Sequence, residues 1–170
     1  MNISLQEVEG VKISAIDIPP WVHLAQQEQI ISRLGPNKEK NAVFTFSVEK
    51  SAPVNKEDHL KFVISTPSGE TWRKEISVSV APPDKFELFQ NYPNTFNPTS
   101  KIEYILPKDS KVKLVIFDVL GQEVRTLVDG IENAGFKSVL FDASGLPSGV
   151  YFYRLQADNS IEVRSMLLMR

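Results

Sequence analysis

Short apolar stretches, many of them alternating with polar residues, recur along the whole chain about every ten residues, with turn-forming residues between them. They predict strands at 11–16, 30–34, 43–48, 60–65 and 71–80, and again at 100–106, 112–117, 123–127, 136–141, 149–156 and 161–168. The stretch 24–34 has some helical character, but its β-branched Ile30 and Ile31 favour a strand. This pattern is typical of antiparallel β-sandwiches, and we expect an all-β fold.

The strongest interruption of the pattern is Pro82-Pro83, which follows the alternating run from Ile76 to Val80. Two consecutive prolines cannot continue a hydrogen-bonded ladder, so the strand should end there. We therefore expect two domains, residues 1–83 and residues 84–170. Within the second we expect turns at Leu120-Gly121-Gln122, with a positive φ at Gly121, and at Asp129-Gly130.

The charges are balanced along the chain. Each half has one acidic residue more than its basic residues, 10 against 9 in residues 1–83 and 11 against 10 in residues 84–170, which gives the net charge of −2. This balance argues against a basic nucleic-acid surface or a polybasic membrane patch. The first residues lack a signal-peptide pattern, and no apolar run approaches the roughly 18 residues of a membrane helix.

The sequence has few groups of residues that could support catalysis or bind a metal. There is no cysteine, which excludes disulfides, thiol catalysis and thiolate metal sites. His23 and His59 stand apart from obvious partners, and we interpret them as surface or turn histidines. The aspartates 118, 129, 142 and 158 each follow a predicted strand without a calcium-loop pattern, so we interpret them as turn formers. We expect no catalytic activity, no cofactor and no metal.

Trp72 follows the turn Pro67-Ser68-Gly69 on a predicted strand, and we expect it to point inward and Lys74 outward. We expect the Trp72 side chain to fill the core of the first sandwich. The alternative is an exposed aromatic platform, as in modules that stack on sugars.

Three ordered motifs distinguish the second half. The segment 89–107 contains Tyr92-Pro93 and Asn97-Pro98, which force extended or turn geometry on the preceding residues. We expect it to lie along a sheet edge without donating hydrogen bonds. Residues 115–127 contain a predicted hairpin turn from Asp118 to Gly121. Residues 142–155 end in a strand whose Tyr151, Tyr153 and Leu155 should face the core.

These motifs resemble the C-terminal sorting domain of the bacterial type IX (Por) secretion system over residues 86–170. One departure is Thr95, where the family usually has a second proline. The resemblance implies recognition by the outer-membrane translocon, export of an attached cargo through the periplasm, and surface attachment or release. The residues that carry the resemblance are Tyr92, Pro93, Asn94, Asn97, Pro98, Asp118, Gly121, Gly149, Tyr151, Arg164 and Arg170.

The first half is similar to immunoglobulin-like or fibronectin-III-like spacer modules of secreted bacterial proteins. The expected fold is thus two tandem immunoglobulin-like antiparallel β-sandwiches, in a monomeric, non-catalytic C-terminal piece of a longer exported protein. The expected partners are the type IX translocon, its attachment machinery and an upstream cargo domain. Two alternatives remain: a scaffold domain of flagellar hook assembly, because the second half also resembles the immunoglobulin-like domain of the hook-capping protein, and a carbohydrate-binding accessory module.

The last predicted strand, 161–168, leads into an apolar run, Met166 to Met169, that lies between Arg164 and Arg170. We expect it to bury its side chains while its free backbone edge and the flanking arginines stay available to a receptor by strand addition.

Overall fold

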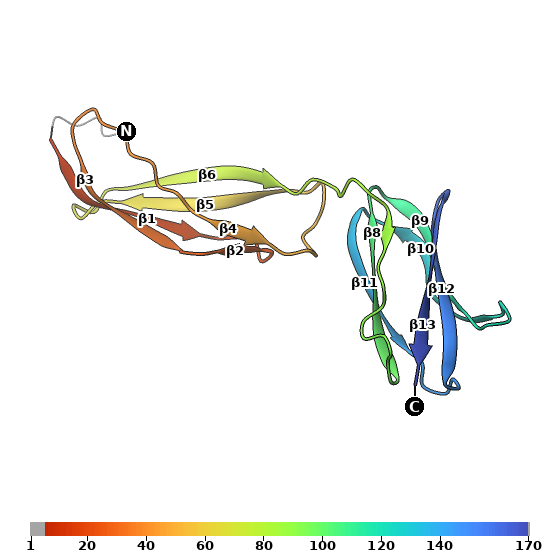
Figure 1. Cartoon of the computed structure of the whole chain (residues 1–170). Coiled ribbons are helices and arrows are strands. Elements are labelled where there is room, and N and C mark those ends of the chain that lie inside the picture. Colours follow the sequence, from red (N-terminus) through yellow and green to blue (C-terminus); the bar gives the residue numbers. More distant parts are fainter. Residues whose placement is uncertain (1–5, 170) are drawn as a thin grey trace. The chain divides into compact units, whose positions relative to one another are not determined.

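The computed structural model describes residues 6–169, and the regular elements in that range are all β-strands. The chain divides into two compact units, Met1–Val80 and Ala81–Arg170 (Figure 1). Each unit has its own hydrophobic core. The all-β class and the antiparallel sheets expected from the pattern are confirmed, and both are compatible with immunoglobulin-like sandwiches. Among the described residues there is no helix of the length and apolarity required to cross a membrane.

The first unit consists of one complete sheet and a small second layer. The sheet has the order β3-β1-β5-β6, and the second layer pairs β2 with β4. Side chains from both layers and from the connections between strands form its core. The strands are β1 (Val8–Ile16), β2 (Val22–Leu24), β3 (Glu28–Leu34), β4 (Phe46–Val48), β5 (Glu57–Ser65) and β6 (Thr71–Ser79).

The second unit is a sandwich of a four-stranded sheet, β10-β9-β12-β13, and a three-stranded sheet, β11-β8-β7. Its core draws fully buried side chains from both sheets, including Tyr104 and Phe141 from one and Leu114 and Tyr153 from the other. The strands are β7 (Glu87–Leu88), β8 (Thr99–Leu106), β9 (Ser110–Phe117), β10 (Glu123–Glu132), β11 (Gly135–Asp142), β12 (Gly149–Ala157) and β13 (Ser160–Leu168).

The alternation predicted for β12 is confirmed. Tyr151, Tyr153 and Leu155 are buried, whereas Val150 and Phe152 are exposed on the other face. The first of these tyrosines also closes the preceding turn, because its hydroxyl donates to the carbonyl oxygen of Pro147 at 2.8 Å.

The sequence-based expectations for parts of β10 and β6 are wrong. Asp129 and Gly130 do not form a turn: both lie inside β10 and pair with Lys113 and Val112 of β9. Trp72 is not a core residue, since its side chain is 50% exposed. It lies on β6, the edge strand of its sheet, and borders an open groove instead of packing under a second layer. The expectation that Lys74 points to the opposite face is also wrong, because residues two positions apart in a strand share a face and Lys74 lines the same groove. Trp21, 7% exposed, occupies the core instead.

Candidate recognition site at one end of the second unit

The strand register brings most of the motif residues to one end of the second unit. Gly149 at the start of β12 pairs with Leu168 at the end of β13, and Thr99 at the start of β8 pairs with Asp142 at the end of β11. The end of β9 lies nearby in register, because Phe117 pairs with Phe152. The starts of β8 and β12 share one end of the sandwich with the ends of β11 and β13, and the β9–β10 turn projects sideways from the half of the sheet nearest that end (Figure 1). We call this end, together with the projecting turn, the motif end.

The segment from Phe89 to Pro98, the motif segment, links the two sheets at this end. Tyr92 forms an antiparallel bridge with Lys101 of β8, with an N–H···O bond of 2.9 Å in each direction. Phe96 forms a parallel bridge with Leu168 of β13, and its N–H donates to the carbonyl oxygen of Leu167 at 3.1 Å. The segment does run along sheet edges, but the expectation that it donates no hydrogen bonds is wrong.

Buried polar groups fix the start of the motif segment. Asn91, 2% exposed, donates through Nδ2 to the carbonyl oxygen of Pro93 and to Ser100 Oγ. The Ser100 hydroxyl in turn donates to the same Pro93 oxygen at 2.7 Å. The hydroxyl of Tyr153 donates to the Phe89 carbonyl oxygen. Buried polar groups with several partners hold one conformation, so the segment has a defined path although its tip is exposed.

Asn94 and Phe96 attach the tip of the segment to the last strand. The Asn94 Oδ1 atom accepts the N–H of Leu167 at 2.9 Å, and Met169 donates its N–H to the Phe96 carbonyl oxygen. The Phe96 ring is 2% exposed and lies 5.9 Å from the ring of Phe141. Pro98 contributes its carbonyl oxygen, which accepts the N–H of Ala143.

The outer edge of β13 is therefore only partly open. Its backbone groups alternate between β12 and the outer edge, and those of Leu167 on the outer edge are already bonded to the motif segment. Gln90 also donates to the carbonyl oxygen of Ser165. The expectation of a free backbone edge along the whole strand is wrong at its end, where Asn94 and Phe96 occupy it.

The turn between β9 and β10 is satisfied by its own residues. Asp118 Oδ1 accepts the N–H groups of Leu120 and Gln122, both at 2.9 Å. Gly121 has a φ of +77°, as expected, which is a conformation that side chains disfavour. The turn in consequence presents the side chains of Val119 and Leu120 to solvent, 67% and 78% exposed.

Arg164 lies away from the motif end, within β13, and has a backbone partner. Its Nε donates to the carbonyl oxygen of Leu88 at 3.1 Å, while Glu162 Oε2 accepts the N–H of Leu88 at 3.1 Å. These two side chains make the hydrogen bonds to Leu88 that a neighbouring strand would otherwise make to the short edge strand β7. They thereby connect β13 of one sheet to β7 of the other and close one side of the sandwich. Arg170 lies outside the described residues.

Most of the exposed motif residues differ from those that hold the fold, although the exposed Asn94 also bonds to β13. Tyr92 is 78% exposed, and Pro93, Asn94 and Asn97 are also exposed, whereas Asn91, Phe96 and Tyr153 are buried. Sequence reasoning did not select Asn91 or Phe96 as site residues. The sequence feature that could have pointed to Asn91 and Phe96 is their position among the prolines of the motif segment. Their partners in β8 and β13 are distant in sequence, so no local pattern indicates these contacts.

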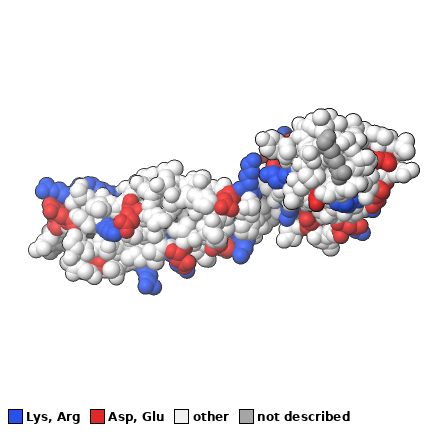
Figure 2. All heavy atoms as spheres, turned by 90° about the horizontal axis from the view of Figure 1, so that it is seen from below, with Lys and Arg blue, Asp and Glu red and all other residues white. Residues whose placement is uncertain are grey.

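The remaining titratable groups do not add a second site. His23 lies 2.8 Å from Glu49 and His59 lies 3.3 Å from Ser77 Oγ, so both are surface histidines, but neither is isolated as expected. Hydrogen bonds from Ser144 lower the pKa of Asp142, which caps the turn after β11. No group of three or more metal-ligating side chains occurs between residues 6 and 169. Figure 2 shows acidic and basic groups interspersed on the visible face.

Comparison with known proteins assigns the second unit. The profile of the family described as secretion system C-terminal sorting domain matches residues 90–169. Among solved structures, the crystal structure of dimeric latent PorU from Porphyromonas gingivalis aligns with a TM-score of 0.41 and 10% identity. That alignment covers 95% of this chain and 16% of the PorU chain. No curated protein matches the sequence. The matched range contains the motif end and β13, and the second unit thus belongs to the family of type IX secretion C-terminal sorting domains.

Proposed function

We propose that residues 84–170 direct an attached cargo across the outer membrane and to the cell surface, after passage through the periplasm. The partners in this proposal are the type IX translocon, its attachment machinery and a cargo domain in the same polypeptide. Residues 1–83 serve as a spacer module, and neither part of the chain is an enzyme. The family match supports the sorting role in general; the cargo, the attachment step and the monomeric state are part of the proposal.

The observation that carries this proposal is the convergence of separate motifs at one end of the second unit. The motif segment, the Asp118–Gly121 turn and Gly149 come from distant parts of the sequence, and the register places them at the same ends of their strands. The exposed side chains there include Tyr92 and Leu120, each 78% exposed. Exposed aromatic and aliphatic side chains on rigid turns are well suited to recognition by a partner protein.

The export test uses the full chain fused behind a periplasmic reporter in a bacterium that has the type IX machinery. We expect the reporter at the cell surface or in the medium. Removal of residues 165–170 should retain it in the periplasm, since this deletes the strand end to which Asn94 and Phe96 bind. Because the deletion also removes the buried Met166 and Leu168, retention alone does not separate recognition from folding.

A pair of surface variants makes that separation. The double variant Tyr92→Ser/Leu120→Ser changes two exposed side chains at the motif end, whereas Ile131→Ser/Ile161→Ser changes two exposed side chains at the opposite strand ends. Both should fold with unchanged stability. We expect the first to lose export and the second to keep it. Equal export of both variants and of the truncated fusion would contradict a signal at the motif end.

A further inference from the structure

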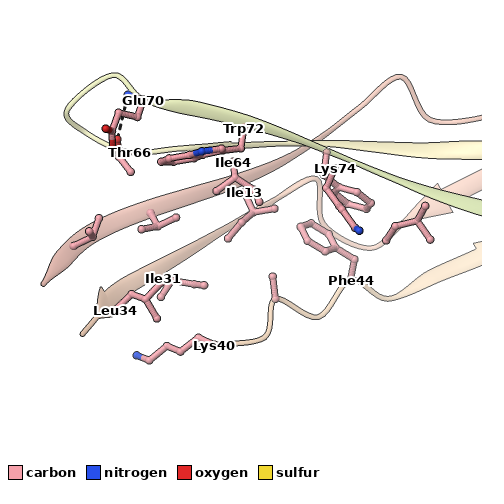
Figure 3. Close-up of a pocket in the computed structure, with 15 residues that line it drawn as sticks. Ile13, Ile31, Leu34, Lys40, Phe44, Ile64, Thr66, Glu70, Trp72 and Lys74 are labelled. Atoms are coloured by element: carbon pink, nitrogen blue, oxygen red, sulfur yellow. Dashed lines mark hydrogen bonds between the residues drawn. The ribbon is translucent and has the colours of Figure 1, made fainter. Parts of the chain in front are cut away.

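The first unit has an open side along which both layers expose apolar side chains. A groove of about 640 Å³ lies between the four-stranded sheet and the segment that leads into β4. In Figure 3, Trp72 and Lys74 of β6 border one side of the groove, Lys40 and Phe44 border the other, and Ile13 and Ile64 lie between them. Most of the lining is aliphatic or aromatic.

Side chains of the groove, and those of β4 just beyond its lining residue Phe44, are exposed although they lie on inner faces. Trp72 and Ile76 on the inner face of β6 are 50% and 45% exposed. Phe46 and Val48 of β4 share a face with the buried Val22, and they are still 49% and 40% exposed. An apolar surface shared by two facing layers is unusual on an isolated domain and indicates a missing occupant.

The backbone of β4, which continues the groove-lining segment that ends in Phe44, has an unpaired edge. Ala25 donates to the carbonyl oxygen of Thr45, and Glu49 donates to that of Trp21, so the odd-numbered residues of this strand bond toward β2. By the alternation of antiparallel pairing, the N–H and C=O groups of Phe46 and Val48 point away from β2. A row of backbone groups at this spacing is complemented by another extended strand.

The charged side chains at the groove indicate which kind of extended segment would bind there. Lys74 lies between Trp72 and Ile76 on the inner face of β6, and Lys40 lies on the opposite side of the groove. Within residues 6–169 neither lysine forms an ion pair or a hydrogen bond. Lys74 is exposed to water in the free chain, and an acidic side chain on the occupant would keep its charge paired when the occupant displaces that water.

We infer that this groove binds an extended segment of a partner polypeptide by strand addition to β4. The segment places apolar, acidic and apolar side chains at alternate positions opposite Trp72, Lys74 and Ile76. Seven residues, about 20 Å of strand, span the groove from Glu70 to Ile76. A sugar fits this site less well, because an aliphatic floor offers few hydrogen-bond partners to hydroxyl groups, and an acyl chain leaves the edge of β4 unpaired.

The test measures binding of a labelled heptapeptide, Thr-Val-Thr-Glu-Thr-Val-Thr, to the full chain by fluorescence anisotropy. We expect saturable binding that weakens about tenfold when the central Glu of the peptide is Lys, because like charges then meet. The variant Lys74→Glu should reverse this preference. Arg73→Glu makes the same charge change on the other face of β6, and it should leave the preference as it is in the unchanged protein.

Two further measurements test the strand pairing. Every second residue of the bound peptide directs its N–H group toward β4. N-methylation of these residues should abolish binding, whereas N-methylation of the residues between them should be tolerated. Phe46→Ser should weaken binding, whereas Val43→Ser, 67% exposed, should not.

The inference is overturned if N-methylation affects binding equally at the two sets of alternate peptide residues. It is also overturned if Lys74→Glu does not change the preference for Glu over Lys at the centre of the peptide. It is equally overturned if dodecanoate or an oligosaccharide occupies the groove and the peptide does not. A concentration-dependent dimer of the full chain that Phe46→Ser disrupts would assign the groove to a second copy instead.

Discussion

The hydroxyl of Tyr153 accepts a hydrogen bond of 2.8 Å from the backbone N–H of Asn91. Tyr153 lies on β12, in the middle of the four-stranded sheet, and Asn91 belongs to the motif segment. A core tyrosine thus sets the position of the segment whose tip carries the exposed Tyr92 and Asn94. The core and the candidate recognition surface are joined through one phenolic oxygen.

Tyr153→Phe should therefore destabilise the second unit without creating a cavity. The variant leaves the N–H of Asn91 and the carbonyl oxygen of Phe89 without their partner, which should cost about 1–3 kcal/mol of unfolding free energy. All four tyrosines lie in this unit and both tryptophans lie in the other. Tyrosine absorbance during urea unfolding consequently reports the second unit alone. Tyr92→Phe, at an exposed position, is the control and should change the free energy by less than about 0.5 kcal/mol.

Arg164→Ala should also destabilise the second unit, by about 1 kcal/mol, because the carbonyl oxygen of Leu88 loses a charged donor. The same urea experiment measures this effect. Lys113→Ala removes an exposed cation of β9 and serves as the matched control. If both variants have the same stability, the contact of Arg164 with β7 contributes nothing, and recognition by a partner would be its only remaining role.

The two tryptophans should respond oppositely to truncation. Trp21→Ala removes a buried ring and should lower the unfolding free energy of the first unit by about 3–5 kcal/mol. Trp72→Ala removes a half-exposed ring and should cost no more than about 1 kcal/mol. Fluorescence of the remaining tryptophan follows each unfolding transition. A large loss in Trp72→Ala would show that its ring is covered in solution.

The stability of the second unit should fall in alkaline solution. Burial raises the pKa of Tyr104 and Tyr153 above the ordinary value of about 10, and the bond from Tyr104 to Glu132 adds to the effect for Tyr104. The unfolded chain releases these protons first as the pH rises. Stability from the neutral phenols is therefore complete below pH ~10 and is lost as the pH rises from there toward the raised pKa.

The variant Tyr104→Phe removes one of these two phenols, so its comparison with the unchanged protein measures the contribution of Tyr104 to the pH dependence of stability. Between pH ~10 and 11 the unfolding free energy of the unchanged protein should fall by up to about 1.4 kcal/mol per pH unit more than that of the variant. The reason is that the variant has one phenol fewer to ionise. Urea unfolding at several pH values measures both slopes, and the lysines common to both proteins cancel in the comparison. Parallel slopes would mean that Tyr104 ionises equally easily in the folded and unfolded chains.

Local pattern predicted those features whose cause is local. The inward face of β12 follows from the alternation of Tyr151, Tyr153 and Leu155, and the turn at Gly121 follows from a glycine between two apolar strands. The failure at Asp129 and Gly130 has the opposite origin. These residue types form turns in isolation, but here a long partner strand, β9, supplies hydrogen bonds that extend β10 through them.

The features that sequence reasoning missed depend on what lies opposite a residue. Alternation placed Trp72 on the inner face of β6, yet it carried no information on whether a second layer covers that face. Likewise, proline spacing predicted an extended motif segment but not its partners. Asn94 and Leu167 are 73 positions apart, and no local pattern relates them.

That separation has a consequence for how a sorting signal is displayed. The tip of the motif segment is held in place by the end of β13, which binds Asn94 and Phe96. A chain interrupted during synthesis, or one still unfolded, contains the same motif residues in sequence but not the same surface. Under the proposed function, a receptor for this surface would therefore distinguish a chain in which β13 has formed and folded from one in which it has not.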